Sequence, residues 1–134
     1  MTRYLLDTNA VIQLLKDGES RIARRLREFD PGAVCLSSIV THELYFGAYG
    51  SARVEASLRR LNAMRLDVLS FDLDDSIAAG EIRAKLKARG TPIGPYDTLI
   101  AGQAMSRNLV LVTANVKEFR RVEGLRVEDW INSG

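Results

Sequence analysis

The stretch "LLDTNAVIQLL" (residues 5–15) places three polar residues between two apolar segments. Its first part predicts a buried strand, which we extend to residues 3–6, and its last part predicts a helix over residues 10–16. Asp7 stands at the join between them. An aspartate there is an ordinary helix N-cap, but the carboxyl end of a strand is also where functional residues gather in parallel sheets. The stretch predicts a strand followed directly by a helix, and it leaves both interpretations of Asp7 open.

The remaining sequence repeats this alternation of short apolar runs and longer helical patterns. We expect strands at 33–37, 67–71 and 109–113, a short edge strand within 125–130, and helices at 20–29, 38–49, 51–64, 72–90 and 95–108. Asp72 suits an N-cap, Gly90 a helix stop and Pro95 a first helical turn. Because parallel strands need crossover connections, the pattern predicts a three-layer α/β/α sandwich with a mainly parallel sheet. We expect residues 1–134 to form a single domain.

The composition of the chain limits the classes of protein to which it can belong. The chain is 46% hydrophobic and 27% charged with a net charge of +2, which is typical of a globular domain. No apolar run is long enough for a membrane span or a signal peptide, so we expect no membrane association and a cytoplasmic location. The single cysteine, Cys35, has no internal disulfide partner and is interpreted as a buried core residue. Arginines cluster at 21–27, 59–60 and 120–126, but charge alone does not indicate a nucleic-acid binder.

Two further acids occupy apolar helix faces. Glu43 shares a helical face with the apolar positions 39, 40, 44 and 47, and Asp97 heads a face formed by positions 100, 101, 104 and 105. A buried ion pair with an arginine would also explain Glu43, and the helix dipole would also explain Asp97. Three acids at one sheet edge repel each other and need a cation, and Mg²⁺ and Mn²⁺ prefer oxygen ligands. The acids therefore predict metal-assisted hydrolysis of a phosphate ester.

Other catalytic arrangements are missing from the sequence. It contains one histidine, His42, which excludes a paired-histidine ribonuclease and a histidine-rich zinc site. We interpret His42 as a surface residue or as a support for its neighbour Glu43. Neither the phosphate-binding GxxxxGK[ST] motif nor a GxSxG motif is present. The carboxylates remain as the set able to catalyse.

Three segments, "LLDTNAVIQLL", "SSIVTHELYFGA" and "PIGPYDTLIAGQAMSRNLVLVTANVKEFRRVEGLRVEDW", together resemble the PIN-domain proteins of the VapC toxin type. The resemblance covers most of the chain, and the string "IGPYDTLIAGQA" followed by "LVTANVKEF" is its most specific part. It implies a PIN-like α/β/α fold and a metal-dependent endoribonuclease, the toxin of a toxin–antitoxin pair. Such a toxin cuts structured RNA such as tRNA and inhibits translation and growth.

The resemblance also assigns roles to individual residues. It implies that Asp7, Glu43 and Asp97 are catalytic, with Asp7 and Asp97 as ligands of Mg²⁺ or Mn²⁺. Supporting or substrate-positioning residues would be Thr8, Asn9, Thr113, Asn115 and Glu118. Many PIN domains carry a fourth acid where this chain has Asn115, which puts a second tightly held metal in doubt. Glu118, one helical turn further on, could replace that acid.

The same resemblance implies partners. We expect a homodimer, a VapB-type antitoxin whose basic side chain enters the acidic pocket, and a larger complex of the two on operator DNA. One alternative is a noncatalytic PIN-like module that binds RNA or protein, which the missing acid at Asn115 favours. A phosphatase of the haloacid-dehalogenase type also begins with a strand ending in aspartate, but it needs a second aspartate where this chain has Asn9.

Overall fold

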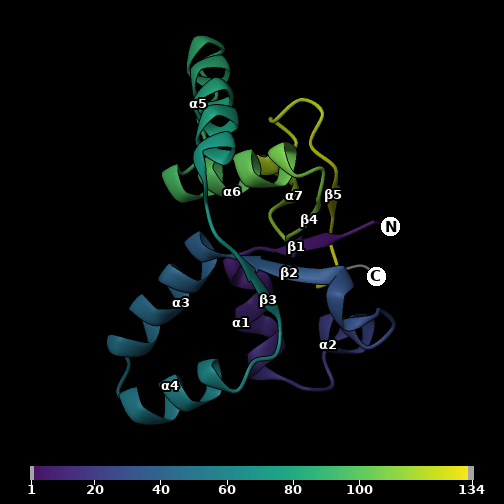
Figure 1. Cartoon of the computed structure of the whole chain (residues 1–134), viewed down its shortest axis with the longest axis vertical. Coiled ribbons are helices and arrows are strands. Elements are labelled where there is room, and N and C mark those ends of the chain that lie inside the picture. Colours follow the sequence, from purple (N-terminus) through teal and green to yellow (C-terminus); the bar gives the residue numbers. More distant parts are fainter. Residues whose placement is uncertain (1, 133–134) are drawn as a thin grey trace.

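The computed structural model describes residues 2–132, and five parallel strands form its centre (Figure 1). They are β1 (Tyr4–Leu6), β2 (Val34–Ser37), β3 (Asp67–Leu69), β4 (Val110–Val112) and β5 (Val127–Glu128). Their order in the sheet is β3-β2-β1-β4-β5, and neighbouring strands pair in parallel, with Leu5 in register with both Cys35 and Leu111. The predicted parallel sheet is confirmed, and residues 125–130 do contain an edge strand.

Helices connect successive strands on both sides of this sheet. They are α1 (Thr8–Lys16), α2 (Arg21–Leu26), α3 (Ser38–Tyr49), α4 (Val54–Asn62), α5 (Leu73–Ala88), α6 (Pro95–Ser106) and α7 (Val116–Phe119), with a 3₁₀ turn at Pro31–Ala33. In Figure 1, helices α1 to α4 lie below the strands and helices α5 and α6 lie above them. The three-layer α/β/α sandwich is therefore confirmed. Among residues 2–132, none of the helices combines the length and the apolar character needed to cross a membrane.

Two predicted helices are too long at their ends. The helix predicted over 20–29 ends at Leu26, because the Phe29 ring stacks on Trp130 with ring centroids 5.1 Å apart. The helix predicted over 51–64 begins at Val54, because the Ser51 hydroxyl donates to the Ala48 carbonyl at 2.8 Å and forms a turn after α3. The 3₁₀ turn and α7 were not predicted, since neither is long enough to show a helical period.

Other local predictions are confirmed. Helix α3 has the predicted bounds, and Asp72 caps α5 in a capping box with Asp75. Gly90 adopts a positive φ of 71°, as expected of a helix stop. Cys35 is fully buried in the core.

Helices α5 and α6 cross in direct contact, because a glycine occupies the crossing point. A Cβ atom at Gly102 would lie 2.6 Å from the Ala79 Cβ and 2.7 Å from its Cα. Next to this contact, Asp75 is completely buried and accepts hydrogen bonds from Gln103 at 3.3 Å and Arg107 at 3.0 Å. This contact fixes α6, which carries one of the predicted catalytic acids.

Replacing Gly102 with alanine tests the crossing. We expect Gly102→Ala to lower the free energy of unfolding by about 1–3 kcal/mol, because backbone atoms of α5 must move to admit the methyl group. The matched control is Gly80→Ala, since Gly80 is an exposed position of α5 where an added methyl group would meet nothing within 4 Å. The control should be stabilised by up to about 1 kcal/mol. Urea unfolding of the three proteins gives both differences, and equal stability of the two variants would contradict the prediction.

Candidate active site

The predicted site residues gather where the strand order reverses. From β1 the chain proceeds to β2 and β3 on one side of the sheet, whereas β4 and β5 occupy the other side. Asp7 follows β1 and Thr113 follows the adjacent strand β4, and the Asp7 amide donates to the Val112 carbonyl at 3.0 Å. In open parallel sheets the crevice at this switch point is the usual binding site.

Asp7 caps helix α1 at the carboxyl end of β1. Its Oδ1 atom accepts the Ala10 amide hydrogen at 2.8 Å, which confirms the N-cap interpretation. The side chain is only 5% exposed. Burial raises the pKa of the Asp7 carboxyl above its usual value, although hydrogen bonds from Thr113 and Ala10 oppose that rise. The nearby Glu43 carboxylate raises the pKa further, so Asp7 carries a charge that its surroundings disfavour.

Glu43 lies at the border of the buried face of α3. The fully buried positions of this helix are Val40, Leu44 and Ala48, and Glu43 is half-buried beside them. Its Oε1 atom accepts a hydrogen bond of 2.7 Å from the Thr8 hydroxyl. Within residues 2–132 Glu43 forms no salt bridge, so the arginine pair considered as an alternative is not found.

Asp97 and Glu118 form a carboxyl pair opposite Asp7. Asp97 lies in the first turn of α6, and burial, a hydrogen bond with Glu118 and repulsion from Glu118, Asp7 and Glu43 raise its pKa to about 7. The pKa of Glu118 is instead lowered, first because the Asn115 amide donates to it at 2.7 Å and then because the Gly94 amide donates at 3.2 Å. Asp97 is therefore protonated below about pH 7, beside a Glu118 carboxylate whose pKa is lowered.

This chain has no carboxylate at the fourth acidic position of many PIN domains, but a glutamate close by supplies one. Asn115, which stands where many PIN domains carry an acid, donates its side-chain amide to Glu118. Its own backbone amide donates to the Thr113 hydroxyl at 3.0 Å. The carboxylate paired with Asp97 is therefore that of Glu118, which lies three residues after Asn115.

The donor set of the crevice fits a hard divalent cation. In the part of the chain that the structure describes, none of the four carboxylates forms a salt bridge with a lysine or arginine. Burial and the neighbouring carboxylates Glu118, Asp7 and Glu43 raise the pKa of Asp97, which a bound cation would oppose. No three histidine, cysteine or carboxylate side chains among residues 2–132 are placed to hold a metal together. Mg²⁺ is commonly bound through one or two carboxylates with water in its other positions, and Asp7 and Asp97 match that number.

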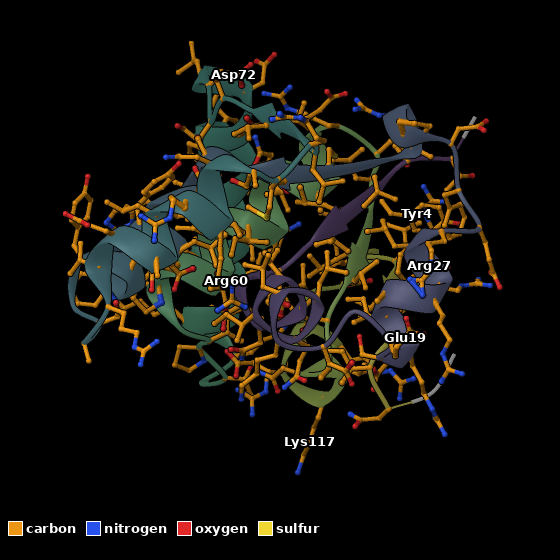
Figure 2. The ribbon with its side chains drawn as sticks, turned by 90° about the horizontal axis from the view of Figure 1, so that it is seen from below. Tyr4, Glu19, Arg27, Arg60, Asp72 and Lys117 are labelled. Atoms are coloured by element: carbon orange, nitrogen blue, oxygen red, sulfur yellow. The ribbon has the colours of Figure 1, made fainter. Side chains whose placement is uncertain are left out.

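Among the predicted supporting residues, Asn9 is exposed and makes no hydrogen bond to the acids in the described residues, whereas Thr113 is fully buried and bonds to Asp7. His42, interpreted as a surface residue or a support for Glu43, is exposed. Several arginines bind backbone carbonyl groups: Arg60 of α4 lies next to α1 in Figure 2, where it donates to the Leu15 carbonyl. Arg27 likewise donates to the Gly18 carbonyl and lies beside Glu19.

A cluster of acids at the switch point of a parallel α/β sheet is the arrangement expected of a metal-dependent hydrolase. Comparison with known proteins identifies the family. The family model "PIN domain" matches residues 4–125, and this chain belongs to the PIN domain family, among its VapC-type members. That membership excludes the haloacid-dehalogenase alternative.

Relatives that match over nearly the full length of both proteins support membership of this family. The chain is 43% identical over 132 residues to the tRNA(fMet)-specific endonuclease VapC of Salmonella typhimurium, covering 97% of this chain and 99% of that protein. It is 38% identical over 133 residues to Ribonuclease VapC2 of Haemophilus influenzae, covering 98% and 100%. The crystal structure of DNA-bound VapBC from Salmonella typhimurium contains a chain with 43% identity that superposes with a TM-score of 0.92, covering 97% of this chain and 99% of that one.

The raised pKa of Asp97 predicts a pH-dependent stability. The carboxyl titrates near 3.8 when unfolded and near 7 when folded, so its contribution is fully present below pH 4 and is lost as the pH rises through 7. Asp97→Asn cannot ionise and escapes this loss. From pH 5 to pH 8.5 in EDTA, the stability of the variant relative to wild type should increase by about 1–2 kcal/mol, after discounting for solvent screening. Urea unfolding at both pH values checks this, and a difference independent of pH would contradict it.

Proposed function

We propose that the chain, as one PIN domain over residues 1–134, is a Mg²⁺- or Mn²⁺-dependent endoribonuclease and the toxin of a toxin–antitoxin pair. It hydrolyses phosphodiester bonds in structured RNA, and tRNA is the substrate class that we favour. The observation that carries the proposal is the convergence of four carboxylates on the switch point, none of which forms a salt bridge within residues 2–132. The name of the Salmonella relative, a tRNA(fMet)-specific endonuclease, supports the choice of substrate. Such a substrate also places the activity in the cytoplasm.

Each carboxylate has a distinct role in this proposal. Asp7 and Asp97 hold the metal ion, which when bound offsets negative charge on the phosphate and lowers the pKa of water. Glu43 receives the Thr8 hydrogen bond at Oε1, and its Oε2 atom is left to orient a water molecule or accept its proton. Thr113 and the Ala10 amide hold Asp7 in position. Glu118 lies beside Asp97 and would accept a hydrogen bond from its protonated form when no cation is bound.

The groove beside Glu43 suits the antitoxin. A groove of about 250 Å³ begins at Glu43 and runs between α1, α3 and α4. Its lining is mostly apolar, with two cationic residues, and includes Ile12, Leu15, Lys16, Leu44, Arg60 and Leu61. A partner segment with an apolar face would fit along it and could direct a basic side chain at the acids. The Salmonella crystal structure is of a VapBC assembly bound to DNA, so we propose a VapB-type antitoxin here, a homodimer of this chain, and binding of the joint complex to operator DNA.

A noncatalytic RNA- or protein-binding module remains the alternative. It was favoured by Asn115, which lacks the charge of the acid found at that position in many PIN domains. The side chain of Asn115 instead holds Glu118, which supplies a carboxylate next to Asp97. This contact weakens the reason for the alternative, and cleavage assays decide between the two.

Metal dependence is tested with purified initiator tRNA, tRNA(fMet). We expect cleavage with Mg²⁺ or Mn²⁺, no cleavage in EDTA, and a loss of at least about 100-fold in Asp7→Asn and Asp97→Asn. Sequencing of the RNA ends should show one or a few sites with 5′-phosphate and 3′-hydroxyl termini. In the absence of RNA, Mg²⁺ should raise the melting temperature of the wild type and not that of Asp97→Asn. Growth arrest by Asp97→Asn equal to that of wild type, without RNA cleavage by either, would instead establish the noncatalytic alternative.

The role of Glu43 is tested separately from metal binding. Glu43→Gln should lower kcat by about 10²–10⁴-fold because the amide cannot accept a proton, while the Mg²⁺-induced rise in melting temperature is retained. Thr8→Val should lower kcat less, by about tenfold, since the glutamate remains but loses its orienting bond. Thr8→Ser keeps the hydroxyl and serves as the control. Full activity of Glu43→Gln would assign this residue a structural role.

A further inference from the structure

Two aromatic side chains stand directly beside the acids of the site. His42 precedes Glu43 on α3, and Tyr96 precedes Asp97 on α6. Their ring centroids are 5.5 Å apart with an angle of 53° between the ring planes. Helices α3 and α6 contact each other at the end of the sheet where β1 terminates, at the left of the strands in Figure 1. The two rings therefore bridge the elements that carry two of the catalytic acids.

Both rings are exposed to solvent, and neither packs into the core in the part of the chain that the structure describes. Tyr96 is 45% exposed, and His42 is exposed as well. Within residues 2–132 neither side chain donates or accepts a hydrogen bond, and the contact between the two rings is the one specific interaction that they make. Pro95 begins α6 just before Tyr96, and the exposed Tyr96 ring offers a flat surface beside the His42 ring. Packing of the core does not explain why it lies there.

We propose that His42 and Tyr96 form a stacking shelf for one unpaired nucleobase of the RNA, next to the phosphate that is cut. The inference rests on the proposed function and names a part of the substrate. Proteins that read single-stranded RNA stack bases on aromatic rings, and every base presents a flat π-face for this contact. In the proposed function, the phosphate that is cut lies next to the proposed metal ligands Asp7 and Asp97. The adjoining nucleotide then has its base within reach of the rings that flank those residues.

A second copy of this chain is the competing occupant of the shelf. Exposed Phe46 (78%) and Tyr49 (65%) continue the same face of α3 away from His42 and offer an apolar surface for such a contact. We favour RNA for His42 and Tyr96 themselves, because these are the two exposed rings that directly precede the acids Glu43 and Asp97. Other exposed aromatic residues of α3 offer a contrast: Tyr49 is 65% exposed and lies seven residues, about 10 Å, further along the helix from His42. Tyr49 is thus a matched exposed tyrosine that stands away from the acids.

The test measures cleavage of initiator tRNA and of the same RNA with a single abasic nucleotide on either side of the mapped cut. Tyr96→Ala should raise KM for the intact RNA about 5- to 100-fold with kcat changed less than about threefold, because stacking acts equally in the ground and transition states. His42→Ala should act in the same direction. Tyr96→Phe, which keeps the ring, and Tyr49→Ala should resemble wild type. The Tyr96→Ala penalty should disappear on the RNA that lacks the stacked base.

Several results would overturn the shelf. One is an increase in KM in Tyr96→Ala that is equal for intact and abasic RNA. Another is a loss of the Mg²⁺-induced rise in melting temperature in this variant. Either result would show that the substitution disturbs Asp97 instead. A change in oligomeric state measured by light scattering, without a change in KM, would assign the rings to contact with a second copy. RNA binding by anisotropy in the Asp97→Asn background separates the two proposals. If wild type cuts no RNA, yet Tyr96→Ala weakens binding of intact RNA while Tyr96→Phe and Tyr49→Ala do not, the endonuclease proposal fails and the stacking proposal stands.

Discussion

Repulsion among buried and half-buried carboxylates is the constraint around which the structure is organised. Burial and neighbouring carboxylates raise the pKa values of Asp7 at the end of β1 and Asp97 on α6, and Glu43 on α3 contributes to both shifts. The Ala10 amide and the Thr113 hydroxyl donate to Asp7, the Thr8 hydroxyl donates to Glu43, and the Gly94 amide donates to Glu118 beside Asp97. The parallel sheet and the close crossing of α5 and α6 fix these donors, so the fold supplies the rigidity that a cluster of like charges cannot supply for itself.

The sequence predicted the sheet well because each strand is a short apolar run bounded by polar residues. Helices were predicted best where capping chemistry is local, as at Asp72 and Gly90. The errors at residues 20–29 and 51–64 have a different origin. Phe29 leaves the helical path to stack on Trp130, far away in the chain, and Ser51 closes a turn through its hydroxyl. Tertiary contacts of this kind override the helical pattern and cannot be inferred from a window of neighbouring residues.

The sequence predicted that the acids gather at one edge of the sheet, but not which residues hydrogen-bond to them. Glu43 and Asp97 stood out because they occupy apolar helix faces, and the sheet edge that they share followed from the order of strands and helices. The bond from Thr8 to Glu43 and the bond from Gly94 to Glu118 join residues 35 and 24 positions apart, which no local pattern reveals. Tyr96 was not among the predicted site residues, and its position directly before Asp97 was the available signal.

The double use of Asp7 has an evolutionary consequence. Asparagine is as good an N-cap as aspartate, so the exchange of one carboxylate oxygen for an amide nitrogen would remove the proposed metal ligand while leaving the α1 cap in place. For a protein that harms its own cell, this makes silencing by a single substitution easy. The silenced chain would keep its folded surface and still sequester its partner. Selection to maintain such a protein must therefore act on its chemistry, since the stability of the fold does not protect this residue from loss.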